Sequence, residues 1–419
     1  MFPLHLTPIY NGFTLILWGS IMVNKGIKKS RVITLFTLSL CCFCFTPTEC
    51  SRKEFPKLQD RTELCGFTSL FYTPDREHCK QVIISSIFGN LTIEEPVLIE
   101  VLQHPQFKRL SKIRQHGHWY YLCQNDSYTR YEHSVNVFVI VRMFGGSIEE
   151  QVSALLHDIS HTVFSHVGAY YFSDHYRTAD SYQDDTHESF LKAHGFEALL
   201  KKYNLTIASI HHQNKTFTIL EQKLPDLCAD RIEYNITGGL YKGIINKEEA
   251  RALIAAIRYE NGHWYFINTE AAERFSEISL KLTEFLWGGA VDNLSTLWLA
   301  QSLRRAVATG ILTQEMVCNA TDDTVWEILC KSTDPLIVDR LYRMKNSWDY
   351  FALDDAAYDT IIYGKFRGTD PLVLHNDGSF KRLTEIDSNY NTEFERVKAC
   401  IKNGWHIRFT KVSQWAADN

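Results

Sequence analysis

Residues 130–166 constrain the fold more than any other stretch, because they predict two short helices joined by a tight turn. Apolar residues recur at helical spacing from Val135 to Phe144, and Gly145-Gly146 provide the left-handed residue that commonly ends a helix. Ser147, with Glu150 three residues later, is typical of a capping box at the start of a second helix. The stretch therefore predicts an antiparallel helix pair.

Three residues of types that bind metals lie at the open end of this pair. From His133 the first helix rises by roughly 17 Å and the second returns by roughly 15 Å, at about 1.5 Å per residue, so His133 and His157 should lie at the same level. His157 and Asp158 point about 100° apart and can share one ion only beyond the helix end. Each of these residues alone would more often be an ordinary core or surface residue. Together, imidazole and carboxylate groups suit a divalent ion such as Mn, Fe, Zn or Mg.

A fourth ligand has to come from another part of the chain, and Asp230 is the candidate. The segment LPDLCADRIEYNI predicts a helix with Pro225 in its first turn, and Asp230 and Tyr234 then lie four residues apart on one face. The sequence alone leaves open a second interpretation, in which Asp230 is a solvated acid next to Arg231.

Arg130 precedes His133 by three residues, which is about one helical turn. Its guanidinium group could therefore reach the metal site and bind a phosphate group of a substrate during catalysis. The alternative is a structural salt bridge to Glu132 or to another acid.

Taken in order, these motifs resemble the HD-domain metal-dependent phosphohydrolases, whose pattern H…HD…D matches His133, His157-Asp158 and Asp230. They are similar to the branch that contains the sterile-alpha-motif-linked dNTP triphosphohydrolase and its bacterial relatives. The matching segments are HPQFKRLSKIRQHG (104–117), RYEHS (130–134), LLHDISHTVFSH (155–166), THE (186–188) and ADRIEY (229–234). The resemblance implies a mainly α fold, a divalent metal cofactor, a homo-oligomer and hydrolysis of a dNTP to a deoxynucleoside and triphosphate.

The resemblance also implies roles for side chains around the metal. Gln115 would contact the sugar or base, and Tyr234 would contact a phosphate. His161 would take part in catalysis and His166 would face the substrate. His187 would be the general acid that protonates the leaving oxygen.

Two departures from the family pattern lie near the reacting groups. His116 stands where relatives carry leucine, so a polar ring would contact the substrate. Ala169 stands where relatives carry the aspartate that orients the general acid, His187, which we expect in the first turn of a helix capped by Thr186. The acids that could replace that aspartate are Asp174, Asp184, Asp185 and Glu188.

Two further departures concern the sugar and the phosphates. Gly238 replaces an aspartate that contacts the sugar in a relative, and Gly238-Gly239 is typical of a helix end. The dNTP-cleaving relatives usually carry a basic residue after an aromatic one where this chain has Trp287-Gly288. Nucleotide monophosphatase or phosphodiesterase activity, or a non-catalytic metal- and nucleotide-binding module, are therefore the alternative functions.

Residues 1–50 are typical of a secretory leader. Four basic residues between Lys25 and Arg31 precede a 14-residue apolar run, Val32 to Phe45, which is too short to span a membrane comfortably. If residues 22–50 act as a signal, the protein is exported or contacts a membrane through residues 1–50, and otherwise it is cytoplasmic. An uncleaved anchor and a misassigned start are the alternatives.

The rest of the chain predicts a helical HD domain over residues 51–345 and a small α+β subdomain over residues 346–419. The subdomain is expected from strand patterns in TIIYGKF, PLVLHNDGSFKRL and WHIRFT and from a helical pattern between Glu393 and Lys402. The formal net charge of −5 provides no general attraction to nucleic acid, so we expect no stable nucleic-acid binding.

Overall fold

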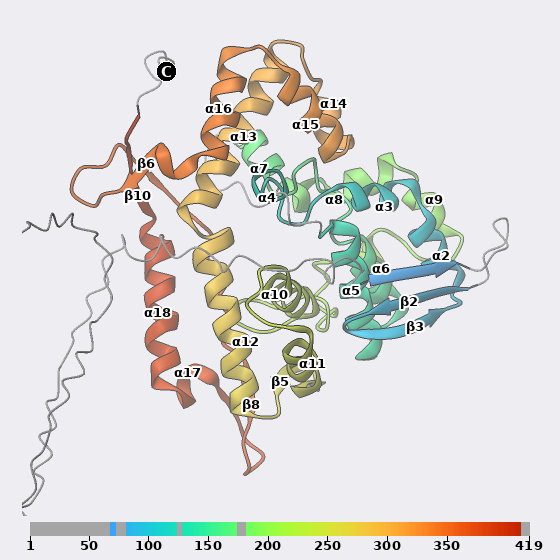
Figure 1. Cartoon of the computed structure of the whole chain (residues 1–419). Coiled ribbons are helices and arrows are strands. Elements are labelled where there is room, and N and C mark those ends of the chain that lie inside the picture. Colours follow the sequence, from blue (N-terminus) through green and yellow to red (C-terminus); the bar gives the residue numbers. More distant parts are fainter. Residues whose placement is uncertain (1–67, 73–80, 124–127, 174–181, 412–419) are drawn as a thin grey trace, which may run out of the picture. The chain divides into compact units, whose positions relative to one another are not determined.

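A computed structural model of the chain describes residues 68–72, 81–123, 128–173 and 182–411. The described part is mainly α with three small sheets, as the sequence predicted (Figure 1). The leader expected in residues 1–50 lies outside the described residues. Within the described part, no helix is both long enough and apolar enough to cross a membrane.

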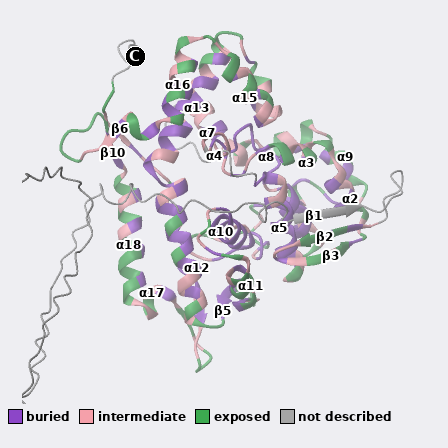
Figure 2. Ribbon diagram, viewed as in Figure 1, coloured by how far each residue is buried: buried purple, intermediate pink, exposed green. Residues whose placement is uncertain are grey.

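The helical core runs from α2 to α16. Its helices are α2 (Pro96–Gln103), α3 (Pro105–Arg109), α4 (Trp119–Cys123), α5 (Arg130–Met143), α6 (Ile148–Leu156), α7 (Val167–Phe172), α8 (Tyr182–Ala193), α9 (Phe196–Lys201), α10 (Ala229–Tyr241), α11 (Lys247–Ala256), α12 (Thr269–Leu282), α13 (Ala290–Ala308), α14 (Gln314–Asn319), α15 (Asp322–Lys331) and α16 (Pro335–Lys345). Figure 2 shows α5 and α10 almost wholly buried, which places these two helices in the middle of the core.

The predicted helix pair is α5 and α6. The side chain of Thr129 accepts a hydrogen bond from the backbone N–H of Glu132, and Glu132 completes the capping box, so α5 begins at Arg130. Gly145 has a φ of +83° and allows the turn, as expected from its missing side chain. The pair is therefore fixed by local signals at both ends of the turn.

At the start of α6, only half of the expected capping box forms. Ser147 Oγ accepts from the backbone N–H of Glu150 at 3.2 Å. The carboxylate of Glu150 instead accepts from the backbone N–H groups of Ile219 and Leu220, at 3.0 and 2.9 Å. This carboxylate therefore anchors the segment that leads into α10 rather than its own helix.

Helix α10 differs from the prediction at both ends. It begins at Ala229, so Pro225 precedes the helix instead of occupying its first turn. It also continues through Gly238 and Gly239 to Tyr241. A Cβ atom on Gly239 would lie 3.1 Å from Ile278 Cγ2 of α12. These glycines therefore let α10 and α12 pack closely and do not end the helix.

The sheets lie at the edges of the helical core. The strands are β1 (Thr68–Tyr72), β2 (Val82–Ser86), β3 (Gly89–Ile93), β4 (Ile257–Glu260), β5 (His263–Phe266), β6 (Phe351–Leu353), β7 (Thr360–Ile362), β8 (Leu372–Leu374), β9 (Phe380–Arg382) and β10 (Trp405–Phe409). They form sheets in the orders β1-β2-β3, β6-β10-β7 and β4-β5-β8-β9, all antiparallel except for the β5–β8 pair.

The C-terminal strands and the helix expected within residues 346–419 are present. That helix is α18 (Ser388–Asn403), which follows the short α17 (Leu383–Ile386) and runs beside α12 (Figure 1). Strand β5 precedes residue 345 and β8 follows it, and the two strands pair, so one sheet contains strands from both predicted domains. The loop between β7 and β8 returns to the helical core.

Candidate metal centre and substrate pocket

Four side chains from three parts of the chain meet at one point. Nε2 of His133 lies 3.0 Å from Asp230 Oδ1, 3.1 Å from His157 Nε2 and 3.4 Å from Asp158 Oδ2. Nε2 of His157 lies 3.6 Å from Asp158 Oδ2 and 3.8 Å from Asp230 Oδ1. The structure therefore brings together the four residues that the sequence predicted as metal ligands.

The ends of three helices produce this convergence. His133 lies in the first turn of α5, and Asp230 lies in the first turn of α10. Helix α6 ends at Leu156, so His157 and Asp158 follow its last residue and can turn toward the same point, as the hairpin geometry required. Helices α5 and α10 pack against each other in the core.

The spacing of the donor atoms fits one divalent ion. Four donors that surround an ion tetrahedrally, at bond lengths of about 2.1 Å, lie about 3.4 Å from one another. The separations between each of the two histidines and the other donor atoms, 3.0 to 3.8 Å, scatter around that value. Two imidazole nitrogens and two carboxylate oxygens suit Mn, Fe, Zn or Mg.

The charges of this group favour a cation. Burial would raise the pKa of Asp158, but the guanidinium group of Arg130 holds that pKa well below its usual range. Burial would lower the pKa of His133, but Glu233, Asp230 and Asp158 raise it to about 10. In the absence of an ion, His133 therefore carries a proton that a divalent cation would replace.

Glu233, a residue that the sequence interpretation missed, fixes the orientation of His133. Its carboxylate is fully buried and lies 2.5 Å from Nδ1 of His133, which leaves Nε2 directed at the other ligands. Carboxylates that orient metal-binding histidines in this way are common in metal sites. Glu233 follows Asp230 by one helical turn, and this spacing indicates that both carboxylates lie on the same face of the helix, toward the metal ligands.

Arg130 contacts the metal ligands directly. Its Nη1 donates to Asp158 Oδ2 at 2.5 Å, and its Nε donates to Ser165 Oγ at 2.9 Å. The acid that it pairs with is therefore Asp158, while Glu132 serves in the cap of α5. The side chain is buried and still lines the cavity in front of the ligands.

His161 and His166 lie next to the four ligands. Nε2 of His161 is 3.1 Å from Asp158 Oδ1, and its ring centre is 5.0 Å from that of His166. Both histidines line the cavity. Burial and the positive charge of Arg130 lower the pKa of His161.

The bend between these two histidines is strained and is held by distant residues. Phe164 and Ser165 have φ values of +57° and +56°, a conformation that costs an L-residue roughly 1–2 kcal/mol. The backbone N–H of Phe164 donates to Asp322 Oδ1 at 2.6 Å. Ser165 Oγ donates to the carbonyl of Arg114 at 2.6 Å. These contacts stabilise the bend that presents both rings.

The cavity in front of the ligands has a volume of about 460 Å³. Gln115, His116 and Tyr234, the predicted substrate contacts, all line it. The rings of Tyr234 and Trp287 meet edge to face with centres 5.4 Å apart, and the ring of His116 lies 6.5 Å from that of Trp287. The polar ring at position 116 therefore does lie in the wall of the cavity.

Comparison with known proteins agrees with this geometry. The family model described as "HD domain" matches residues 130–235, which include all four ligands. The uncharacterized protein YdhJ of Bacillus subtilis is 30% identical over 325 residues, which cover 78% of this chain and 98% of YdhJ. The chain belongs to the HD-domain metal-dependent phosphohydrolases.

Two further relatives of this HD-domain protein match over shorter lengths. The metal-dependent phosphohydrolase cns2 of Cordyceps militaris is 34% identical over 42% of this chain and 50% of its own length. The mouse deoxynucleoside triphosphate triphosphohydrolase SAMHD1 is 26% identical over 35% of this chain and 25% of its own length. A crystal structure of the phosphohydrolase BT4208 from Bacteroides thetaiotaomicron has the same fold, with a TM-score of 0.58 at 14% identity, and covers 82% of this chain and 100% of its own.

His187 is placed differently from the expectation for this HD-domain chain. Helix α8 is already formed at Tyr182, and Thr186 Oγ1 donates to the carbonyl of that residue, so Thr186 does not cap the helix. The ring of His187 is buried, lies outside the cavity lining and bonds the carbonyl of Leu156 at 2.9 Å. Of the acids considered as its partners, Asp184 lines the cavity but interacts with His212.

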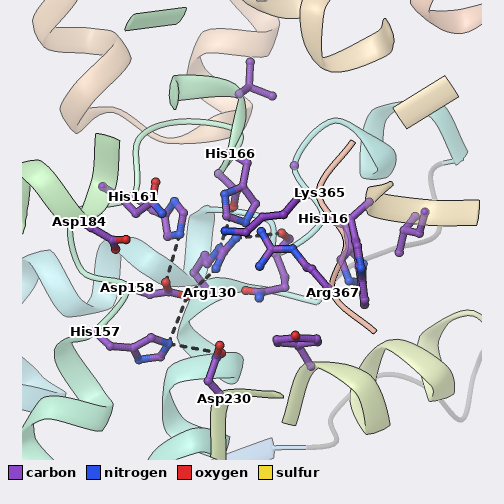
Figure 3. Close-up of a pocket in the computed structure, with 18 of the residues that line it drawn as sticks. His116, Arg130, His157, Asp158, His161, His166, Asp184, Asp230, Lys365 and Arg367 are labelled. Carbon is purple, nitrogen blue, oxygen red and sulfur yellow. Dashed lines mark hydrogen bonds and ion pairs between the residues drawn. The ribbon is translucent and has the colours of Figure 1, made fainter. Parts of the chain in front are cut away.

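Two cationic side chains that the sequence did not indicate also line the cavity of this HD domain. Lys365 and Arg367 come from the loop between β7 and β8 and point into the cavity opposite the metal ligands (Figure 3). No local pattern marked them, because they lie more than 130 residues after Asp230 and reach the site only through the return of the C-terminal segment.

Proposed function

We propose that this metal-dependent phosphohydrolase cleaves deoxynucleoside triphosphates into a deoxynucleoside and triphosphate. One observation carries the proposal: three of the four metal ligands, His157, Asp158 and Asp230, line a cavity whose walls also carry cationic and aromatic side chains. A cavity of about 460 Å³ lies within the range that holds ligands of nucleotide size. The name of the relative SAMHD1 states the same activity for that protein.

The triphosphate would bind between the metal ligands and three cationic side chains. Arg130 is fixed next to Asp158, and Lys365 and Arg367 face the cavity from the other side (Figure 3). One planar guanidinium group can bind two oxygens of the same phosphate group, and an ammonium group contributes a single positive charge. Lys365 and Arg367 would therefore supply the positive charge that Gly288 does not provide after Trp287.

The nucleoside would bind near the rings at the other wall. Tyr234 and Trp287 offer flat apolar surface, and His116 adds a ring that can also hydrogen bond. The side-chain oxygen of Gln115 is buried at the cavity wall without a hydrogen-bond partner among the described residues. This oxygen would accept a hydrogen bond from a hydroxyl or an N–H group of the substrate.

In the proposed reaction, the oxygen of water attacks the α-phosphorus, and the bond from that phosphorus to the 5′ oxygen breaks. His133, His157, Asp158 and Asp230 would hold a divalent ion, which when bound would supply Lewis-acid polarisation of the phosphoryl group and would favour deprotonation of the attacking water. Arg130 holds phosphoryl oxygens in place. The leaving oxygen needs a proton, and we assign its delivery to the pair His161 and His166 because both line the cavity, whereas His187 does not.

Cleavage of a nucleotide monophosphate or of a phosphodiester is the alternative reaction of the same site. One observation favours it: Ala169 and Gly238 stand where, by the resemblance, dNTP-cleaving relatives carry an aspartate that orients the general acid and an aspartate that contacts the sugar. The homo-oligomer and the leader stay predictions.

A substrate panel separates these reactions. The purified chain would be incubated with Mn²⁺ and with dNTPs, nucleoside monophosphates or cyclic nucleotides, and the products would be separated by chromatography. Our proposal predicts equal amounts of deoxynucleoside and triphosphate. Release of inorganic phosphate from monophosphates alone would support the alternative. A metal-loaded chain that turned over no member of the panel would refute both.

The cationic loop provides a second test. In the double variant Lys365→Ala, Arg367→Ala we expect KM for a dNTP to rise at least tenfold, because two charges that face the phosphates are lost, while KM for a monophosphate changes less. Lys381→Ala, which removes an exposed lysine of β9, is the matched control. An unchanged KM for the triphosphate in the double variant would contradict the assigned binding mode.

A further inference from the structure

A carboxylate that the proposed reaction does not use lies in the wall of the substrate cavity. It belongs to Asp292, in the first turn of α13. The side chain is 16% exposed, and because Asp292 is one of the lining residues, its exposed part faces the cavity. Asp292 makes no hydrogen bond or ion pair with any of the four metal ligands. The carboxylate is therefore available to a part of the substrate other than the reacting phosphoryl group.

The contacts of Asp292 place it beside the turn that carries His116. Its Oδ1 accepts a hydrogen bond from Nε1 of Trp119 at 2.5 Å and lies 3.6 Å from Nε2 of His118. Both residues follow His116 directly in the chain. Figure 3 shows His116 on the opposite side of the cavity from His157. Asp292 therefore lies near the wall that we assign to the nucleoside.

Polar atoms at this wall are able to bind a ligand. Oδ2 of Asp292 has no hydrogen-bond partner among the described residues, and Nε2 of His118 is buried without one. The His118 side chain is only 3% exposed and also lines the cavity. A buried polar atom without a partner costs free energy, and such atoms are rare unless a ligand or water satisfies them. A ligand with several polar atoms along one edge would satisfy both groups.

The surroundings of Asp292 suit a ligand that donates hydrogen bonds. Burial raises the pKa of Asp292 to about 7, while the hydrogen bond from Trp119 and the charges of Lys242 and Arg367 oppose that rise. The N-terminus of α13 also favours a negative charge in its first turn. Hydrogen bonds donated to a carboxylate lower its pKa further. A ligand with N–H donors would therefore keep Asp292 ionised.

We propose that Asp292, together with His118, selects guanine as the base of the nucleotide, an inference that rests on the proposed function. One edge of guanine presents an acceptor, O6, followed by two donors, N1–H and N2–H. The two oxygens of Asp292 would accept from these donors, and Nε2 of His118 would donate to O6. The ring of His118 is neutral at pH 7 because burial lowers its pKa to about 3. Its Nδ1 lies 3.5 Å from the hydroxyl of Thr296, which can donate to it and leave the proton on Nε2.

The other three bases fit these side chains less well. Adenine and cytosine present an amino group next to a ring nitrogen that accepts hydrogen bonds, and thymine presents one N–H group between two carbonyls. Each of them would place an acceptor opposite an oxygen of Asp292 and leave a buried polar atom unpaired. The rings of Tyr234 and Trp287 can stack on any base, since every base has a flat face. The choice among bases would therefore depend on Asp292 and His118.

Rates with different bases test this assignment. The full chain with Mn²⁺ would be given the four dNTPs and the four deoxynucleoside monophosphates, and kcat/KM would be measured for each. We expect kcat/KM for dGTP to exceed that for the other dNTPs, and for deoxyinosine triphosphate, which lacks the 2-amino group, by at least about tenfold. Asp292→Asn should lose this preference and gain activity on deoxyxanthosine triphosphate, whose 2-carbonyl accepts from the new amide. Asp355→Asn, which changes an exposed acid paired with His406, is the matched control and should still prefer dGTP.

Equal kcat/KM for the four bases, or an unchanged preference in folded Asp292→Asn, would overturn the proposal. If thermal unfolding shows that this variant does not fold, the wild-type chain decides alone, and equal rates with dGTP and deoxyinosine triphosphate would overturn it. A preference for guanine among the monophosphates, in a chain that leaves triphosphates intact, would refute the proposed function and support this role of Asp292. If no nucleotide is cleaved, calorimetric titration with dGMP and dAMP measures the preference, and equal affinities would overturn it.

Discussion

Replacing Glu233 by glutamine would show how much this buried carboxylate contributes to metal binding. Its Oε1 accepts from Asn136 Nδ2 at 2.9 Å and from Thr237 Oγ1 at 2.8 Å. Its Oε2 contacts the hydroxyl of Tyr128 and Nδ1 of His133. A glutamine has nearly the same shape but only one acceptor oxygen, so its amide N–H₂ group must face donors on one of these two sides.

The size of the effect follows from these contacts. Removing a group that orients a metal-binding histidine typically weakens metal binding about 10- to 100-fold, which corresponds to about 1.4–2.7 kcal/mol. The unpaired buried donor adds a loss of about 1–3 kcal/mol in the free energy of unfolding. In Glu233→Gln we therefore expect both weaker metal binding and a lower melting temperature.

Competition with a coloured chelator would measure the metal affinity, and thermal unfolding would measure the stability. Glu284→Gln is the matched control, because Glu284 is also a buried glutamate but pairs with Arg396, at 2.9 Å, and contacts none of the four ligands. This control should lose stability and keep its metal affinity. An unchanged affinity in folded Glu233→Gln would refute the role assigned to the carboxylate.

Three further predictions concern the same region. Asp322→Asn should lower the free energy of unfolding by about 1–3 kcal/mol, because the two oxygens of the buried carboxylate accept from the backbone N–H groups of Arg114 and Phe164, and an amide has only one oxygen. Chemical denaturation measures this, and an unchanged free energy of unfolding would contradict it. Gly117→Ala should unfold at a lower temperature than wild type, because φ is +50° and the new Cβ would lie 2.5 Å from the carbonyl oxygen of Phe164. Binding of a divalent ion at pH 7 should release about one proton, because the pKa of His133 is raised to about 10 and the ion displaces that proton. The affinity for the ion should therefore rise with pH. Calorimetry in buffers of different ionisation enthalpy counts the released protons, and a count of zero would contradict this prediction.

The sequence predicted those parts of the site that depend on local signals. Capping residues and glycines define the helix pair α5–α6, and that pair alone brings His133 to the level of His157. Asp230 was predictable only as a candidate, because its distance from the others depends on the packing of α10 against α5.

The remaining parts depend on contacts between distant segments. Lys365 and Arg367 reach the cavity because β8 pairs with β5, and no periodicity near them indicates this. Gly238-Gly239 predicts a helix end, because a glycine needed for close helix packing cannot be distinguished by sequence from a glycine that ends a helix. Threonine is a residue type that favours N-cap positions, but α8 already includes the residues that precede Thr186.

The central claim is that His133, His157, Asp158 and Asp230 hold one divalent ion. A crystal of the chain soaked in Mn²⁺ and measured for anomalous scattering tests it most directly. We predict an anomalous peak within about 2.0–2.3 Å of a donor atom from each of the four residues. A Mn²⁺-saturated crystal without a peak among these four side chains would contradict the claim.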